Sequence, residues 1–410
     1  MITSDINETL RIIINLAAFI LFIYIFLQEY GIAFSHYPKL PIEIYSYLFL
    51  VILVMIVSSA LSKQPIIGFY ETFRQLFFFI LVYILYSYLS RYLLISKYIA
   101  IIVSASIIIA ILIIYSFFTS DLAIFLLQAQ GIVHEGGGFK NVTAAGGIFA
   151  VSIPLTLLFI LKGDDNHRIK SFLLITLLII QFIGLFLTNS RSGILAAVIS
   201  TTLVIYILRR SKLKQYLISL ALIVTVLLFV LPALSELFSL YFRVDRIFEN
   251  TRFPLWNMSL NIIRENFIVG TGPGQFKNFM YNHIPVMLGS WEEEQIAWIY
   301  KNAGLGESHN FLLFKSAELG LMGFLIAIYL PFVFIRISIK TMKLIDRSNK
   351  DFAIAAVIFS MGVGMFFRSL FESTGLLSNG WIVRDLPFWI CFSVLIHLYM
   401  RYTKNSEIKL

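Results

Sequence analysis

Residues 308–335 read SHNFLLFKSAELGLMGFLIAIYLPFVFI, and this stretch decides the class of fold. After a short polar start, it stays mostly apolar over about the 20 residues that an α-helix needs to cross a membrane. Similar apolar runs recur from one end of the chain to the other. The chain is 59% hydrophobic and only 13% charged, whereas soluble domains are about one quarter charged. The sequence therefore predicts an all-α fold, a polytopic bundle of transmembrane helices.

The apolar runs predict about eleven spans, within a range of about ten to twelve, each near the length that a bilayer requires. They lie at roughly 10–28, 43–62, 67–89, 93–118, 141–161, 171–188, 192–208, 216–232, 310–335, 352–370 and 386–401. The first run has no small-residue cleavage site after it, so we expect a retained span and not a signal peptide. The single cysteine, Cys391, lies in an apolar run, which leaves no disulfide or cysteine–metal site.

The basic residues predict the orientation of the bundle. They concentrate in short segments beside spans, at residues 209–214 and 336–350 and in the C-terminal tail, and such segments face the cytoplasm. The net charge of +9 is therefore an orientation signal and not a nucleic-acid footprint. Three connections are then expected to face outward, namely residues 188–192, 234–309 and 371–385.

The long outward connection predicts a division of the chain into three parts. These are an N-terminal transmembrane bundle (1–233), a large outer loop (234–309) and C-terminal transmembrane helices (310–410). Loops of such length are uncommon unless they have a role. We expect a small helical cap over the outer ends of the bundle.

His309 and Asn310 stand at the mouth of the span quoted above. Histidine is the commonest general base, and asparagine offers a donor and an acceptor. The alternative for His309 is an interfacial anchor at the depth of the lipid headgroups. Gly320 and Gly323 follow on one face of the predicted helix, which suits close helix packing.

Two arginines are expected on the same side of the membrane as His309. Arg191 lies in a very short outward turn, where positive residues are disfavoured by orientation; its alternative is snorkelling at a span end. Arg252 carries a planar fork that matches phosphate oxygens. Its alternative is a salt bridge with Glu249 or another loop acid.

Other polar groups carry weaker signals. Residues 270–274 (GTGPG) follow no predicted strand, so they indicate a tight structural turn and not a nucleotide site. Residues 292–294 (EEE) indicate a solvated acidic run. Glu71 and Arg74 share a helix face and are expected to pair, as a structural or a functional group. A further set at the last outer connection either completes the wall of an outer site or pairs internally: Arg368, Glu372, Arg384 and Asp385.

The chain resembles the O-antigen ligase and O-antigen polymerase superfamily of bacterial inner-membrane proteins. Four elements carry the likeness, in the family's order, between about residues 139 and 325. They are Asn141 ahead of a span with Pro154; Thr188, Ser190, Arg191 and Gly193; Arg252, Trp256, Gly270, Gly272, Gly274 and Phe276; and His309, Asn310, Gly320 and Gly323.

The resemblance implies a glycosyltransferase-C-like fold that acts on glycans linked to undecaprenyl diphosphate at the outer, periplasmic face. Arg191 and Arg252 take the places of the family's diphosphate-binding arginines, and His309 takes the place of its essential histidine. Asn310 is expected to be catalytic together with His309, with Asn141 and Arg384 as supporting residues. The family needs no metal or nucleotide cofactor.

These observations favour a polysaccharide ligase that moves a glycan from undecaprenyl diphosphate to lipid A-core. The arginines would stabilise the leaving diphosphate, and His309 would take the proton of the acceptor hydroxyl. Two alternatives stay open. A sister polymerase would use another lipid-linked glycan as acceptor, and a transporter of lipid-linked glycans would place its charges around a midplane cavity.

Overall fold

The computed structural model describes chiefly residues 38–119, 142–161, 168–188, 190–209, 252–280 and 307–407, and the statements below concern these ranges. The spans predicted at 10–28 and 216–232 lie outside them. So do Asn141, the acidic run 292–294 and the basic residues 210–214.

The described part of the chain is helical and contains no strand, which confirms the predicted fold class. Eight of its helices are long and apolar enough to cross a membrane. The elements are α2 (Ile42–Leu61), α3 (Pro65–Tyr92), α4 (Ile95–Thr119), α6 (Val142–Leu161), α7 (Arg168–Leu187), the helix Arg191–Arg209, α10 (Arg252–Glu265), α11 (Phe276–Met280), α13 (Phe311–Leu344), α14 (Lys350–Ser369) and α15 (Ile382–Glu407).

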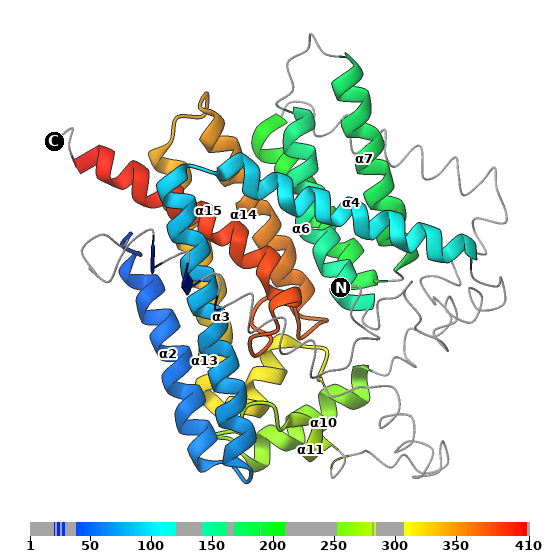
Figure 1. Ribbon diagram of the computed structural model, residues 1–410. Helices are drawn as coiled ribbons and strands as arrows, with labels where there is room; N and C mark the ends of the chain where they lie inside the picture. The colour runs from blue at the N-terminus through cyan, green and yellow to red at the C-terminus, as the bar shows by residue number, and fades with distance from the viewer. Residues whose placement is uncertain are drawn as a thin grey trace.

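The apolar helices differ in how deeply they are buried, and this sets the layers of the bundle. α6 and α14 bury 78% and 72% of their apolar windows, so they form its centre. Figure 1 shows α2 and α3 side by side on one flank, α14 and α15 between, and α4, α6 and α7 on the other flank. The outward faces of α2, α3 and α7 expose large apolar side chains, as lipid-facing surfaces do.

The two ends of the bundle differ in character. At one end, which we call the basic end, Ile345 packs with Ile207 and Tyr402, and Arg401 pairs with Asp351 at 3.6 Å. The opposite end, which we call the site end, holds Thr188 and Ser190, the loop 370–381, α10 and α11 (Figure 1). The charge pattern predicted that the basic segments and the outward connections lie on opposite sides of the membrane. Their described parts lie at opposite ends of the bundle.

α13 continues past the predicted span end at residue 335 as far as Leu344. The basic side chains Arg336 and Lys340 are thus on a helix and not in a connecting loop. These charged residues are tolerated on the helix because both pair with Glu43 at the start of α2, at 3.5 and 3.3 Å. Long basic side chains can also lay their aliphatic stems along apolar surface.

α13 is broken at Gly320, so the prediction that Gly320 and Gly323 lie on one face of an unbroken helix is wrong. Gly320 has φ 65° and ψ −151°, a conformation open essentially to glycine alone. The break removes backbone partners from the helix. The turn 266–275 supplies new ones: Thr271 N donates to Ala317 O at 2.9 Å, and Leu321 N donates to Phe267 O at 2.8 Å.

The glycine-rich turn 270–274 therefore packs into the break of α13 and bonds its backbone. It is a structural turn, as the sequence predicted. Gly272 N donates to the carbonyl of Glu318 at 2.9 Å. A Cβ on Gly270 would lie 2.4 Å from the same carbonyl, so no side chain fits. This docking fixes α10, which precedes the turn, against the first half of α13.

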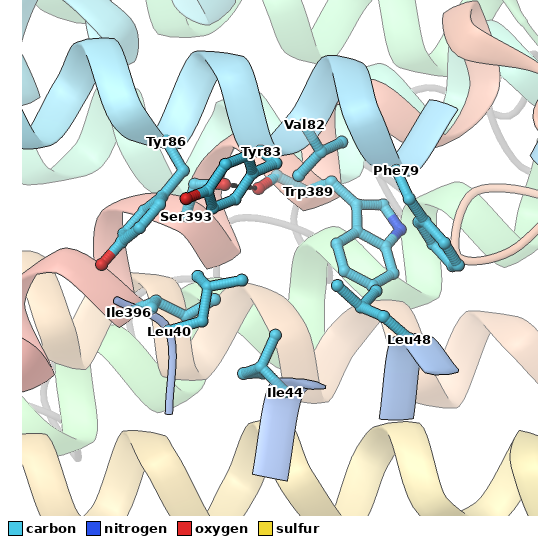
Figure 2. A pocket seen from close by; sticks show the side chains of 10 residues that line it. All are labelled: Leu40, Ile44, Leu48, Phe79, Val82, Tyr83, Tyr86, Trp389, Ser393 and Ile396. Carbon is cyan, nitrogen blue, oxygen red and sulfur yellow. Dashed lines mark hydrogen bonds between the residues drawn. The ribbon is translucent and has the colours of Figure 1, made fainter. Parts of the chain in front are cut away.

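An apolar pocket lies between α2, α3 and α15, near the basic end (Figure 2). Figure 2 shows Trp389 and Phe79 along one side, with Tyr83 and Tyr86 beyond them. The hydroxyls of these tyrosines donate to the carbonyls of Pro38 and Lys39, at 3.2 and 2.9 Å. The pocket is lined mostly by apolar and aromatic side chains, so it offers little polar chemistry.

Candidate active site at the site end of the bundle

The centre of the site is the carboxylate of Glu372, which lies in the loop between α14 and α15 and is 1% exposed. Its Oε1 accepts hydrogen bonds from Arg252 Nη2 at 2.7 Å and from Ser192 Oγ at 3.2 Å. Its Oε2 lies 3.0 Å from His309 Nδ1. One buried acid thus joins residues from three segments that are far apart in the sequence.

His309 reaches Glu372 because of the way the chain enters α13. Its φ of 50° is in the left-handed region, which histidine adopts more readily than most residues. The next residue, Asn310, caps α13 by accepting from Leu313 N at 3.0 Å, and its amide donates to Leu370 O at 3.0 Å. The side chain of Asn310 is therefore engaged with the backbone, in a place that positions His309.

Arg252 is the first residue of α10, where it lies beside the loop 370–381. The aromatic residues that follow it pack on the same loop: the ring centroids of Phe253 and Trp256 lie 5.6 Å apart in an edge-on contact, and those of Trp256 and Phe371 lie 6.4 Å apart. The salt bridge with a loop acid, which was the alternative for Arg252, is present: Arg252 pairs with Glu372 in the loop between α14 and α15.

Arg191 begins the helix Arg191–Arg209, next to Ser192, which touches Glu372. Its turn packs tightly against α6. A Cβ on Gly146 would lie 2.3 Å from Ser190 Oγ, and one on Gly193 would lie 2.9 Å from Gly146 O. The two glycines thus let this turn approach α6 closely and bring the start of the helix to Glu372.

Two further arginines belong to this end of the bundle, and the charge of one of them, Arg368, acts on the Glu372 carboxylate. Arg368 is 1% exposed, donates to Thr374 O at 2.6 Å and packs on Gly147, where a Cβ would lie 3.3 Å from its Cζ. Arg384 pairs with Glu307 at 2.5 Å, just before His309 in the chain. Of the acids and arginines noted at the last outer connection, Glu372 thus joins the site, while Asp385 is internal and accepts from Ser378 Oγ at 2.6 Å.

The charges decide the protonation of the central pair. Burial alone would raise the pKa of Glu372, but the hydrogen bond from His309 and the charges of His309, Arg252 and Arg368 lower it to about 2. Burial works to lower the pKa of His309, but Glu372 outweighs it and raises the pKa above the ordinary value. Glu372 is therefore an anion at neutral pH, and it favours a protonated Nδ1 on His309.

The structure brings two of the predicted site residues, Arg252 and His309, onto one carboxylate. Arg191 is adjacent through Ser192, and Arg384 is joined to the segment before His309 through Glu307. The predicted pair of Glu71 and Arg74 is confirmed. The roles of the site residues stay predictions.

Sequence reasoning did not assign Glu372 the central position. It was noted only as one member of a charged cluster. Its neighbours in the chain are Phe371 and Ser373, and its two charged partners lie more than sixty positions away. The signal that pointed to it was an acid at an outer connection of an otherwise apolar region.

Within the described ranges, no three His, Cys, Asp or Glu side chains are grouped so that they could hold a metal ion. The guanidinium groups of Arg252 and Arg368 supply positive charge beside Glu372. Arginine forks are suited to phosphate oxygens, which they bind in a planar, bidentate manner.

The fold and the site define a polytopic helical membrane protein with a histidine, a carboxylate and arginines gathered at one end of its bundle. Residues 176–328 match the model of a family described as O-antigen ligase, and this match supports the predicted resemblance to the O-antigen ligase superfamily. The matched segment includes Arg191, Arg252 and His309 and ends before Glu372. A search of curated proteins found no match to this chain.

Proposed function

We propose that this protein is a polysaccharide ligase, which transfers a glycan from undecaprenyl diphosphate to a lipid A-core acceptor at the periplasmic face of a bacterial inner membrane. The observation that carries the proposal is the single carboxylate, Glu372, that holds both His309 and Arg252. This arrangement offers a base and a cation at one place, which is what a transfer from a lipid diphosphate requires.

In the proposed reaction, an acceptor hydroxyl oxygen attacks the anomeric carbon of the donor glycan. The bond between that carbon and the diphosphate oxygen breaks, and undecaprenyl diphosphate leaves with the electron pair. Arg252, with Arg191 beside the site, stabilises the charge that develops on the leaving group. His309 takes the proton of the acceptor hydroxyl.

The ring nitrogen that takes the proton follows from the contacts. Ionised Glu372 only accepts hydrogen bonds, so Nδ1 of His309 carries the hydrogen that lies between them. Nε2 is then the basic nitrogen. A buried carboxylate that orients a histidine in this way fixes its tautomer and stabilises the imidazolium that forms.

The test is a reconstitution of the full-length protein in proteoliposomes with purified undecaprenyl-diphosphate glycan. Lipid A-core and a second lipid-linked glycan are supplied as separate acceptors, and products are resolved by gel and mass spectrometry. We expect glycan on lipid A-core, formed equally well in EDTA, because arginines supply the positive charge. Extension of the lipid-linked glycan alone would identify the sister polymerase, and transport without any covalent product would overturn the enzyme assignment.

A further inference from the structure

A second buried polar cluster lies in the bundle and is built on Glu318. Glu318 lies on α13, the helix that begins just after His309, and comes two residues before the break at Gly320. Its side chain is buried, with 1% exposure. Lys315 and Asn379 join it, at 0% and 5% exposure. Charges withdrawn from water in this way are costly unless they are paired and hydrogen-bonded, and the proposed reaction uses none of them.

Both oxygens of the Glu318 carboxylate are bonded to other segments. Oε1 accepts from Gly274 N at 2.7 Å, and Oε2 accepts from Asn379 Nδ2 at 2.8 Å. Lys315 Nζ lies 4.0 Å from Oε2 and donates to Asn379 Oδ1 at 2.5 Å. Glu318 therefore ties α13 to the turn 266–275 and to the loop 370–381 at once.

These are the segments that carry the candidate site. The turn 266–275 follows α10, which begins with Arg252, and the loop 370–381 contains Glu372. His309 immediately precedes the cap of α13. The segments that carry Arg252, His309 and Glu372 are thus joined a second time at Glu318.

We infer that Glu318 is a positioning residue. It fixes the relative positions of α10, the loop 370–381 and α13, which carry or adjoin Arg252, Glu372 and His309. The inference rests on the proposed function. The hydrogen bonds at Glu372 hold these elements at one point, and the carboxylate of Glu318 adds a second side-chain attachment farther along α13, which limits rotation about that point. Register matters because a misplacement of about 1 Å costs on the order of 10²-fold in rate.

A carboxylate suits this place because it presents two acceptor atoms to two donors on opposite segments. Leucine of similar size would leave the donors of Gly274 and Asn379 without this partner. Removal of Glu318 alone would also strand the buried charge of Lys315. A decisive variant therefore replaces both charged residues with apolar ones, since exchange of a whole buried pair is often neutral for stability.

The experiment compares the reconstituted full-length protein with the double variant Lys315→Met/Glu318→Leu. Thermal unfolding in detergent is measured beside the pH dependence of kcat. We expect an unfolding midpoint near that of the parent, a fall in kcat of about 10²-fold, and an acid limb displaced to lower pH. In the parent, Glu372 raises the pKa of His309. In the variant, Glu372 is no longer held against the imidazole, so the pKa of His309 falls and the acid limb moves to lower pH.

A second variant, Asn379→Gly, cuts the tie to the loop 370–381 and leaves the pair of Lys315 and Glu318 in place. Glycine tolerates the φ of 50° at this position. The same displacement of the acid limb is expected. This variant decides the matter if the double variant does not accumulate. Glu43→Gln, which removes a paired acid at the basic end, is the matched control and should leave the profile unchanged.

The outcomes separate this inference from the proposed function. Parental kcat and an unchanged acid limb in the Glu318 and Asn379 variants, with His309→Ala inactive, would overturn the positioning role alone. If His309→Ala is itself fully active, the proposed function fails.

Discussion

At the scale of single residues, the site is governed by the ionisation of Glu372. Three donors, from Arg252, Ser192 and His309, surround a carboxylate that is almost fully buried. An anion in that place costs less than its burial suggests because each partner favours the charged form. The carboxylate thereby orients the imidazole and holds the guanidinium of Arg252 beside it.

His309→Ala should reduce transfer by about 10²–10⁴-fold, which is the usual contribution of a general base. His309→Gln keeps hydrogen bonding but cannot accept a proton at neutral pH, so we expect a similar loss. Single-turnover rates and donor binding are measured in proteoliposomes. Donor binding should persist because the arginines remain.

If glutamine instead restores most of the activity, His309 orients the acceptor and another group takes the proton. If alanine lowers membrane abundance but not specific activity, His309 is an interfacial anchor.

Glu372→Gln should move the acid limb of kcat/KM to lower pH. In the parent, Glu372 raises the pKa of His309, and the base is lost as pH falls through that pKa. Glutamine removes the negative charge, so the pKa of His309 falls and the neutral ring persists to lower pH. The maximal rate should also drop, by up to about 10⁴-fold where a carboxylate fixes the tautomer. An acid limb that stays in place would refute this pairing; Asp351→Asn at the basic end is the control.

Arg252→Lys and Arg191→Lys should each lower transfer sharply at matched expression. Lysine keeps the charge but loses the planar fork that binds phosphate oxygens in pairs. Initial rates are measured against donor concentration, with Arg336→Lys at the basic end as a control of the same chemistry. Near-normal rates in both variants would mean that the two arginines serve orientation or packing.

At the scale of elements, the decisive feature is the pairing of a broken helix with a glycine turn. The break in α13 at Gly320 frees carbonyl and N–H groups in an apolar region, where unpaired backbone groups are costly. The turn 266–275 satisfies them through Thr271, Gly272 and Phe267. The backbone groups at the break are satisfied only when the turn is in place. We therefore expect α10, the turn and α13 to fold as a unit.

Gly320→Ala should destabilise the protein by roughly 1–3 kcal/mol through backbone strain alone. A Cβ there would also lie 2.3 Å from Ile268 O, so the turn must move. The unfolding midpoint in detergent should fall, and transfer should fall with it. Leu321→Ala, at a neighbouring side chain that is 43% exposed, is the control and should have a small effect. Equal midpoints for the two variants would contradict the docking account.

At the scale of the whole molecule, the protein is a bundle with unlike ends. Cationic residues gather at the basic end, and the candidate site occupies the other. In the proposed reaction, the donor keeps its lipid tail in the bilayer while its diphosphate reaches the site end. The proposed orientation places that end in the periplasm.

Thiol labelling tests this orientation, because the native Cys391 is 1% exposed and should not react. Asn257→Cys on α10 should react with a membrane-impermeant maleimide in intact spheroplasts. Ser348→Cys, between α13 and α14, should react only after lysis. The reverse pattern would place the site in the cytoplasm.

Hydropathy predicted most of the described spans because a lipid environment demands helices whose backbone bonds are internal. It failed at Gly320, since a glycine within a helix and one that breaks it look alike in sequence. The site was predicted in part, through His309, Arg191 and Arg252. Glu372 and Glu318 were not assigned, because their partners come from distant segments and only the folded chain brings them together.

The loop 370–381 has a further consequence for how this chain can vary in length. Residues 372–380 are all buried, and Asp385 holds the backbone N–H of Ser378 at 2.5 Å. An insertion or deletion there would displace the carboxylate of Glu372 from both of its charged partners. Related chains should therefore keep a constant number of residues between α14 and α15, and epitope tags belong instead at the exposed residues 347–349.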